Sequence, residues 1–335
     1  MSSYIKSISY YLPEKILTNE QLAEVYKDWL PEKISEKTGI VSRHIAAENE
    51  TALDLGVKAS KRLLSEHDIN PKDIDFVLLA TQSPDYLLPT SACILQNELG
   101  IPTSAGALDF NLGCSAYIYG LALAKAIIAS GMAKNTLLVT AETYSKHINP
   151  MDKSTRTIFG DGAAASLITE GNVGNIGMFV LGSDGSGSKH LIIPAGAMRT
   201  PKSDMTKKEL QDDSGNIRSS ENLFMDGPEI FNFTIEVVPN CVQETLEKNR
   251  LTFTDIDMFI FHQANKYMLD FLRRRLRIPE EKFYVNFSDI GNTVSATIPI
   301  ALSRAAKEER IKKGDKIMLV GFGVGLSWGA TIIEW

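Results

Sequence analysis

The chain has 335 residues, and its 35 lysines and arginines against 41 aspartates and glutamates give a formal net charge of −6. With 44% hydrophobic and 23% charged residues, the composition is typical of a globular protein with a sizeable core, and it excludes disordered and collagen-like chains. The negative net charge argues against a nucleic-acid partner, because affinity for that polyanion comes mainly from clustered lysine and arginine. The length suits one large domain or two linked ones.

The three cysteines, Cys93, Cys114 and Cys241, lie far apart and form no C-x-x-C pair. This spacing excludes a disulfide framework and a thiolate metal site, and it fits the reducing cytoplasm. The N-terminus lacks a basic segment followed by an apolar one, so no signal peptide is expected. The most apolar run, residues 115–133, carries Lys125 near its centre, which suits a helix buried in protein better than one in a bilayer. We expect a cytoplasmic protein without membrane insertion.

Two parts of the chain repeat each other. The segment 73–79, which ends in a short apolar strand, reappears as 255–261, and each copy continues into a helix that ends before an Ile-Pro dipeptide. Further strands are expected, in chain order, at 106–112, 136–140, 162–168, 283–287, 316–320 and 329–333. Apolar, β-branched strands that alternate with helices predict an α/β protein of two pseudo-symmetric halves with stacked, buried sheets.

The expected boundary between the halves lies near residue 175, so that residues 1–175 form an N-terminal half and residues 176–335 a C-terminal half. After this boundary, residues 183–222 are rich in Gly, Ser, Lys and Asp and show little periodicity. We expect an irregular connection or lid there, with residues 201–220 as its most mobile part.

Three polar residues follow apolar strands, where a parallel sheet presents its C-terminal edge. Cys114 stands between a strand and an apolar helix, where the helix dipole and free backbone N–H groups favour the thiolate. His262 and Asn292 each follow a strand of the second half. Taken singly, each is more simply explained as a structural residue. Because ligands of open α/β sheets bind outside such strand ends, and because the repeat relates the loops, we expect the three side chains to converge.

Two further motifs invite a functional interpretation that their context does not favour. Asp161 lies in Phe-Gly-Asp-Gly-Ala, where the flanking glycines indicate a tight turn and a structural role. The glycine-rich stretch 321–325 precedes a strand rather than a helix N-terminus. It therefore does not predict a dinucleotide site.

Together, the motifs resemble those of the β-ketoacyl-acyl-carrier-protein synthase III family, within the thiolase-like superfamily. They span essentially the whole chain and follow the family's order: Thr38-Gly39-Ile40, Gly113-Cys114-Ser115, Phe159-Gly160-Asp161-Gly162-Ala163, His262-Gln263-Ala264-Asn265, Gly291-Asn292-Thr293, Gly321-Phe322-Gly323-Val324-Gly325 and Trp328-Gly329-Ala330. The resemblance implies a thiolase-like α/β fold with stacked sheets in a layered α/β/α/β/α arrangement.

The resemblance implies a ping-pong, decarboxylative Claisen condensation of an acyl thioester primer with malonyl-acyl-carrier protein, in fatty acid or related lipid or secondary-metabolite biosynthesis. Cys114 would carry the acyl group, and His262 and Asn292 would stabilise the enolate left when carbon dioxide departs. Backbone N–H groups of Cys114 and Val324 would form the oxyanion hole. Phe322 would keep the site apolar. Phosphopantetheine would arrive by a narrow tunnel as part of its carrier, and no metal or separate cofactor is implied.

The resemblance also implies two protein partners. One is a second copy of the chain: Leu88 would reach into the partner's acyl pocket, and the apolar strand 136–140 would suit a sheet that continues across the interface. Leu88 is smaller than the aromatic residue often found there, which indicates a different pocket shape. The other partner is acyl carrier protein, which would dock on a basic helix face beside the His262 motif, unless that face is simply solvated. Its cations are Lys266, Arg273, Arg274 and Arg275.

The primer site departs from the family pattern. Members that use acetyl-CoA sandwich its adenine between Trp and Arg, and they carry a further Arg before Phe-Gly-Asp-Gly. The aligned positions here read Lys33, Lys37 and Lys153, while Pro228 replaces an amide side chain. Lysine keeps a charge for phosphates but lacks a planar stacking surface. We therefore expect acetyl-CoA to be a poor primer and the acyl group to arrive on a carrier protein or another thioester. The alternative is CoA bound through its phosphates and pantetheine.

Three rival functions stand beside this one. A cysteine hydrolase also presents Cys, His and Asn in this order, but the papain-like signature around Cys114 is absent. A non-catalytic acyl-binding paralogue has no need of a complete triad. A specialised condensing enzyme of the same superfamily, acting with another acyl donor, fits the sequence equally well.

Overall fold

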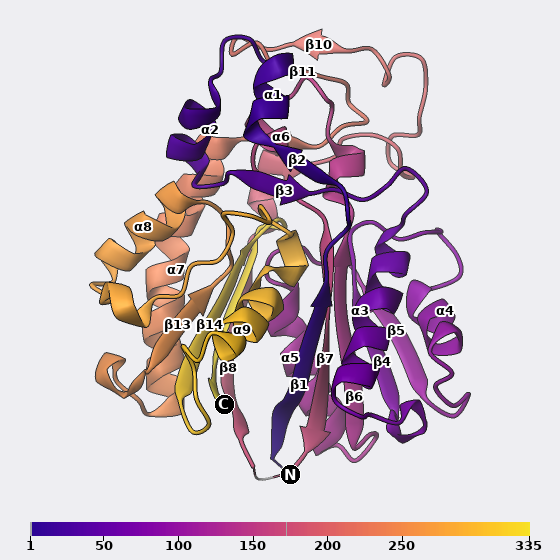
Figure 1. Cartoon of the computed structure of the whole chain (residues 1–335), viewed down its shortest axis with the longest axis vertical. Helices are drawn as coiled ribbons and strands as arrows, with labels where there is room; N and C mark the ends of the chain where they lie inside the picture. Colours follow the sequence, from indigo (N-terminus) through magenta and orange to yellow (C-terminus); the bar gives the residue numbers. More distant parts are fainter. Residues whose placement is uncertain (1, 172) are drawn as a thin grey trace.

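The computed structural model describes residues 2–171 and 173–335. Two mixed sheets form the frame of the protein. The first sheet has the strand order β1 (Ser3–Tyr11), β7 (Gly162–Glu170), β6 (Asn135–Glu142), β4 (Phe76–Ala80) and β5 (Gly106–Phe110). The second has the order β13 (Met258–Phe261), β14 (Lys316–Gly323), β15 (Ser327–Glu334) and β8 (Asn175–Ser183). Figure 1 shows the two sheets next to each other, one built mainly from each half of the chain.

The two sheets repeat one topology. In the first, β4 pairs in parallel with β6, and β7 and β1 follow in antiparallel order. In the second, β13 pairs in parallel with β14, and β15 and β8 follow in antiparallel order. The pseudo-symmetric α/β halves predicted from the repeat are thus confirmed.

The structure corrects two strand predictions. The strand expected over residues 283–287 is reduced to one parallel bridge between Phe283 and Phe259, in the place that β5 occupies beside β4. The segment 136–140, expected to carry a sheet across a subunit interface, belongs to β6, which already pairs on both sides. A strand with two partners has no free edge, so the edges of this sheet are β1 and β5.

Helices form three layers around the sheets (Figure 1). Between the sheets lie α5 (Ala116–Ala129), which contacts β6 and β14, and α9 (Thr297–Lys307), which contacts β1 and β13. The outer face of the first sheet is covered by α3 (Ala52–Glu66) and α4 (Ser91–Glu98). On the far side of the second sheet lies α7 (Gly227–Asn249), with α8 (Lys266–Arg275) beside it. This is the predicted α/β/α/β/α order.

Smaller elements gather at the end of the molecule where the site lies. β2 (Ile16–Thr18) pairs with β3 (Ser42–His44), and the two helices α1 (Asn19–Val25) and α2 (Pro31–Thr38) lie between these strands in the sequence. The short helix α6 (Lys153–Arg156) precedes β7. The predicted irregular connection contains only short pieces: the 3-10 helix η3 (Gly185–His190), β9 (Leu191–Ile192), β10 (Leu210–Gln211) and β11 (Ile217–Arg218), with β12 (Phe224–Met225) just after it. Here β9 pairs with β12, and β10 with β11.

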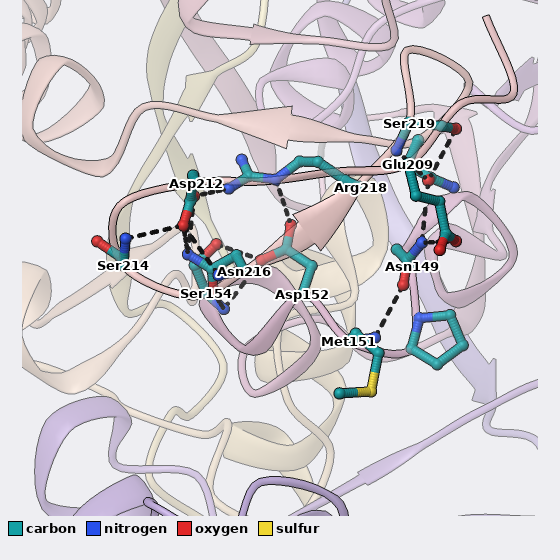
Figure 2. A network of polar contacts seen from close by, with 12 residues as sticks. Asn149, Met151, Asp152, Ser154, Glu209, Asp212, Ser214, Asn216, Arg218 and Ser219 are labelled. Carbon is teal, nitrogen blue, oxygen red and sulfur yellow. Dashed lines mark hydrogen bonds and ion pairs between the residues drawn. The ribbon is translucent and has the colours of Figure 1, made fainter.

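The last part of this connection is tied to α6 by a polar network (Figure 2). The guanidinium of Arg218 lies 3.3 Å from the fully buried carboxylate of Asp152 and also pairs with Asp212. Asp152 in turn caps α6 by accepting a hydrogen bond from the Ser154 backbone at 3.0 Å. Asn149 donates to Glu209 at 2.7 Å. Residues 209–218, within the stretch expected to be most mobile, are therefore anchored to the segment that carries Lys153.

The apolar run 115–133 becomes the buried helix α5, as its composition predicts. Its lysine, Lys125, donates to the carbonyl oxygens of Ile176 at 2.5 Å and Gly177 at 2.8 Å, both in β8. The charged side chain that argues against a membrane-spanning helix thus links α5 to the second sheet. Within residues 2–171 and 173–335, no helix is long and apolar enough to cross a membrane.

Replacing Lys125 should weaken this link. Lys125→Met keeps the stem but leaves two carbonyl oxygens without their donor, so we expect the free energy of unfolding to fall by about 1–3 kcal/mol. Chemical denaturation followed by circular dichroism measures it. Lys134→Met, at an exposed site after the same helix, is the control and should stay within about 0.5 kcal/mol of the parent. Equal losses in both variants would contradict the role given to Lys125.

Candidate active site

Cys114, His262 and Asn292 line one small cavity of about 50 Å³. Cys114 comes from the first half, just before α5, whereas His262 follows β13 and Asn292 precedes α9 in the second half. Their exposed fractions are 6%, 2% and 4%. The structure therefore brings together the three residues that the strand ends predicted, and it buries all of them.

Asn292 is held by backbone hydrogen bonds on both sides. Its N–H donates to Ile158 O at 2.9 Å, and its C=O accepts from the Gly160 N–H at 3.0 Å. Its side-chain Oδ1 accepts from the Val294 N–H at 2.8 Å, which leaves Nδ2 3.4 Å from His262 Nε2. Val294 adopts this position with a φ of 55°, a strained value for a β-branched residue. The orientation of the carboxamide is thus set by the backbone around it.

His262 is fixed by a hydroxyl on one side and an aromatic ring on the other. Its Nδ1 lies 2.8 Å from Thr297 Oγ1, and the ring meets the buried ring of Phe322 edge-on, with 5.5 Å between centroids. Phe322 also lines the cavity, as expected of it. Burial lowers the pKa of His262 to about 3. The imidazole is therefore neutral at physiological pH.

Burial outweighs the local features that favour the thiolate of Cys114. Burial, and secondarily the nearby Glu142, raises the pKa of Cys114 to about 12. The backbone N–H groups of Cys114 and Val324 both act on the sulfur in the opposite direction, as predicted, but they do not offset the loss of solvent. The resting group is a thiol, and the base that shares its cavity is the neutral His262.

The glycine-rich turn 321–325 approaches Cys114 more closely than any side chain would permit. A Cβ added at Gly323 would stand 2.9 Å from the Cys114 sulfur, and one added at Gly321 would stand 2.9 Å from the Cys114 carbonyl oxygen. The turn needs glycine because the nucleophile packs against its backbone. The same approach brings the Val324 N–H to the sulfur.

Sequence reasoning missed Glu142, the last residue of β6. Its carboxyl is fully buried and accepts from the Gln82 N–H at 3.0 Å and from the Ser295 hydroxyl at 2.9 Å. Because Ser295 belongs to the second half, this bond joins the halves beside the cavity. Burial raises the pKa of Glu142 to about 8. Its only signal in the sequence is an acid at the end of an otherwise apolar strand.

A surface cleft of about 470 Å³ lies next to the cavity. The two hollows share Ile158 and Asn265 as lining residues, and the cleft is also lined by Trp29, Lys37 and Lys266. A thioester arm held in the cleft would therefore have a short route to Cys114. This arrangement fits the predicted tunnel.

A planar side chain, Trp29, lies among the three lysines that occupy the aligned primer positions. The ammonium groups of Lys37, Lys33 and Lys153 lie 4.7, 5.6 and 5.9 Å from the centre of the half-buried Trp29 indole. Trp29 stands four residues before Lys33, in the segment between α1 and α2, so it is not at the aligned position, although its ring lies beside the same lysines. Lys153 also pairs with Asp28 at 2.6 Å. The site combines an aromatic face with three cations.

The predicted docking face on α8 is only partly open. Arg274 and Arg275 are exposed, and Lys266 borders the cleft. Arg273 is turned inward: it donates to Ile278 O at 3.4 Å and lies 3.7 Å from a carboxylate oxygen of Glu280. The free cations of the face are thus at its ends.

Two other sequence expectations concern Leu88 and Asp161. Leu88 is 84% exposed on the loop between β4 and α4, and it is not among the residues that line the cavity of its own chain.

Asp161 is buried and accepts hydrogen bonds from the backbone of Ala46 at 2.7 Å and of Ser145 at 2.9 Å. These bonds support the structural role expected of it. In the described parts of the chain, no group of His, Cys, Asp and Glu is arranged to hold a metal ion.

The raised pKa of Glu142 predicts a pH-dependent stability. Because the folded state holds this proton more tightly than the unfolded state, whose carboxyl has a pKa near 4.5, stability from this group is lost as pH rises from 4.5 through about 8. Glu142→Gln cannot ionise, so its free energy of unfolding should gain a few kcal/mol on the parent between pH 5 and pH 8.5.

Urea denaturation at several pH values measures this difference. Glu244→Gln, at an exposed position of α7, is the matched control. A difference between Glu142→Gln and the parent that does not change with pH would contradict the assignment.

Comparison with known proteins places this site in a family. The models of 3-oxoacyl-[acyl-carrier-protein] synthase III match residues 108–185 and, for its C-terminal part, residues 246–335. The β-ketoacyl-[acyl-carrier-protein] synthase III of Caldanaerobacter subterraneus subsp. tengcongensis is 42% identical over 330 residues, which cover 97% of this chain and 95% of that protein.

Solved structures agree in fold over the whole chain. A crystal structure of a 3-oxoacyl-(acyl-carrier-protein) synthase III superposes with a TM-score of 0.98 and 48% identity and covers all of both chains. The β-ketoacyl-[acyl-carrier-protein] synthase III from Thermus thermophilus follows with 0.88 and 38%, over 99% of each chain. The thiolase-like fold predicted from the motifs is confirmed, and the chain belongs to the β-ketoacyl-acyl-carrier-protein synthase III family of condensing acyltransferases.

Proposed function

We propose that this chain catalyses the decarboxylative condensation of an acyl thioester primer with malonyl-acyl-carrier protein, through an acyl group held on Cys114. The observation that carries the proposal is the burial of a thiol, a neutral imidazole and a carboxamide in one cavity that adjoins a larger surface cleft. A cysteine hydrolase is a poorer fit, because the mostly apolar lining of the cavity disfavours an attacking water.

In the first half-reaction, His262 accepts the thiol proton as the Cys114 sulfur attacks the primer's thioester carbonyl. The carbonyl oxygen becomes an oxyanion beside the N–H groups of Cys114 and Val324, which already face the sulfur. Collapse of this intermediate breaks the bond to the leaving sulfur, which takes the proton back from His262. The imidazole is neutral again and the acyl group stays on Cys114.

In the second half-reaction, His262 and Asn292 Nδ2 hydrogen-bond the thioester carbonyl of the malonyl group. Loss of carbon dioxide leaves an enolate at that carbonyl, and its carbon attacks the acyl-Cys114 carbonyl. The Cys114 thiolate that leaves then takes a proton from water that enters through the cleft. Phe322 and the other apolar lining residues favour departure of a charged carboxylate as a neutral molecule. These steps use side chains, backbone and the phosphopantetheine of the substrate, so the proposed reaction requires no separate cofactor or metal.

The two half-reactions should separate by mutation. Cys114→Ala should take up no acyl group from a primer thioester. Asn292→Ala should still be acylated, whereas its rate of malonyl decarboxylation should fall by about 10²–10³, the usual loss for one oxyanion donor. Intact-protein mass spectrometry and carbon dioxide release measure the two steps. Acylation that persists at another residue of Cys114→Ala would contradict the mechanism.

The cleft supports a CoA thioester as the primer, contrary to the expectation from aligned positions. The Trp29 indole offers a stacking face for adenine, and Lys33, Lys37 and Lys153 can meet the phosphates. Asp28, paired with Lys153, is the anion that a phosphate would displace. This primer site rests on Trp29, which the alignment-based expectation left out.

Loss of the indole should weaken primer binding without slowing chemistry. Because stacking on an aromatic side chain is worth about 1–3 kcal/mol per base, Trp29→Ala should raise the KM for acetyl-CoA by about tenfold or more at unchanged kcat. Asp28→Asn should lower that KM. The KM for malonyl-acyl-carrier protein is the internal control and should not change. An unaltered KM for acetyl-CoA in Trp29→Ala would contradict this primer site and would support a primer bound to a carrier protein.

The partners follow from the same geometry. We place acyl carrier protein on α8, because Lys266 borders the cleft and Arg274 and Arg275 extend this positive surface. We place a second copy of the chain at the open edge of β5, where exposed apolar residues collect: Tyr86, Leu87, Leu88 and Leu108.

The division into halves 1–175 and 176–335 agrees with the start of β8 at Asn175. A cytoplasmic location fits these substrates and the three free cysteines.

A further inference from the structure

The space beside Cys114 suits only a small acyl group. The cavity that the triad shares measures about 50 Å³, far less than the roughly 300–1,000 Å³ of pockets that hold drug-sized ligands. Eight of its other lining residues are apolar: Ile158, Phe159, Leu191, Met225, Ile230, Ala264, Met268 and Phe322. The walls of this cavity therefore decide which primers can be carried on the sulfur.

One wall is backed by a buried tyrosine that the sequence motifs do not include. The ring of Tyr144 is 5% exposed, and its centroid lies 5.3 Å from that of Phe159, which lines the cavity. Tyr144 and Cys114 belong to the same cluster of buried residues. Tyr144 thus fills the volume into which a longer acyl chain beside Phe159 would have to extend.

The tyrosine is locked in place by a chain of hydrogen bonds. Its hydroxyl donates to Gln82 Oε1, and Gln82 Nε2 donates to Asn111 Oδ1 at 3.0 Å. Gln82 Oε1 also lies against Gly113, since a Cβ added there would meet it at 2.6 Å. The wall therefore continues to the residue before the nucleophile. A chain that displaced the ring would leave the hydroxyl and the amide unpaired, which is more costly than the contacts that it gains.

We propose that Tyr144, held by Gln82, sets the primer length and restricts this enzyme to acyl groups of two or three carbons. The inference rests on the proposed function, because it concerns the acyl group bound to Cys114. It assigns specificity to a side chain of the same subunit. This complements Leu88, which is small and lies outside its own cavity.

Two substitutions separate volume from hydrogen bonding. Tyr144→Leu opens the wall, and Tyr144→Phe keeps the ring but frees Gln82. The probes are acetyl-CoA, butyryl-CoA and hexanoyl-CoA, and the rate of Cys114 acylation is followed by intact-protein mass spectrometry. We expect the parent to react with hexanoyl-CoA at least tenfold more slowly than with acetyl-CoA. Tyr144→Leu should raise the hexanoyl rate at least tenfold at a similar acetyl rate, and Tyr144→Phe should fall between them.

Tyr117→Phe is the matched control, since it deletes another buried hydroxyl, which lies 3.1 Å from Ser166 Oγ. It should leave the ratio of the two rates unchanged. Equal acetyl and hexanoyl rates in the parent, or an unchanged ratio in a folded Tyr144→Leu, would overturn the proposal. If Tyr144→Leu does not fold, an unchanged ratio in Tyr144→Phe overturns it. Failure of every thioester to acylate Cys114 would instead overturn the proposed function, and this inference with it.

Discussion

Burial of the reactive groups is the constraint on which the rest of this structure depends. A thiol, an imidazole and a carboxamide from different parts of the chain share a cavity that holds little water, and desolvation keeps both titratable members uncharged at rest. Charge then develops only while a thioester is present, where the N–H groups of Cys114 and Val324 are already aimed at it. The same lack of water protects the acyl-enzyme.

The two halves build this cavity by holding each other's backbone. The segment 158–160 of the first half hydrogen-bonds Asn292 on both sides, and Glu142 reaches Ser295 across the same boundary. The connection after β8 adds a third tie, because Arg218 clamps the buried Asp152 beside α6 (Figure 2). Primer cleft, cavity and connection therefore share one short segment, residues 152–160, and should respond together when it is disturbed.

Local pattern and repetition were enough to predict the two halves and the convergence of Cys114, His262 and Asn292, because strand ends and topology are written in the order of residues. The layer order was predicted from the resemblance of the motifs to a known family. The protonation of Cys114 was not predictable, since the helix terminus is local whereas the desolvation that outweighs it comes from the whole fold. Trp29 escaped because it lies in the connection between α1 and α2, four residues before the aligned position. Tyr144 escaped because its partners lie far away in the chain.

The claim that burial holds Cys114 as a thiol is tested most directly by its alkylation rate as a function of pH. Iodoacetamide modification is followed by peptide mass spectrometry, which separates Cys114 from the exposed Cys93. The account predicts a slow rate at Cys114 that keeps rising with hydroxide concentration beyond pH 9, because only the thiolate reacts. A rate that is already at its plateau below pH 7 would show a resting thiolate and contradict the account.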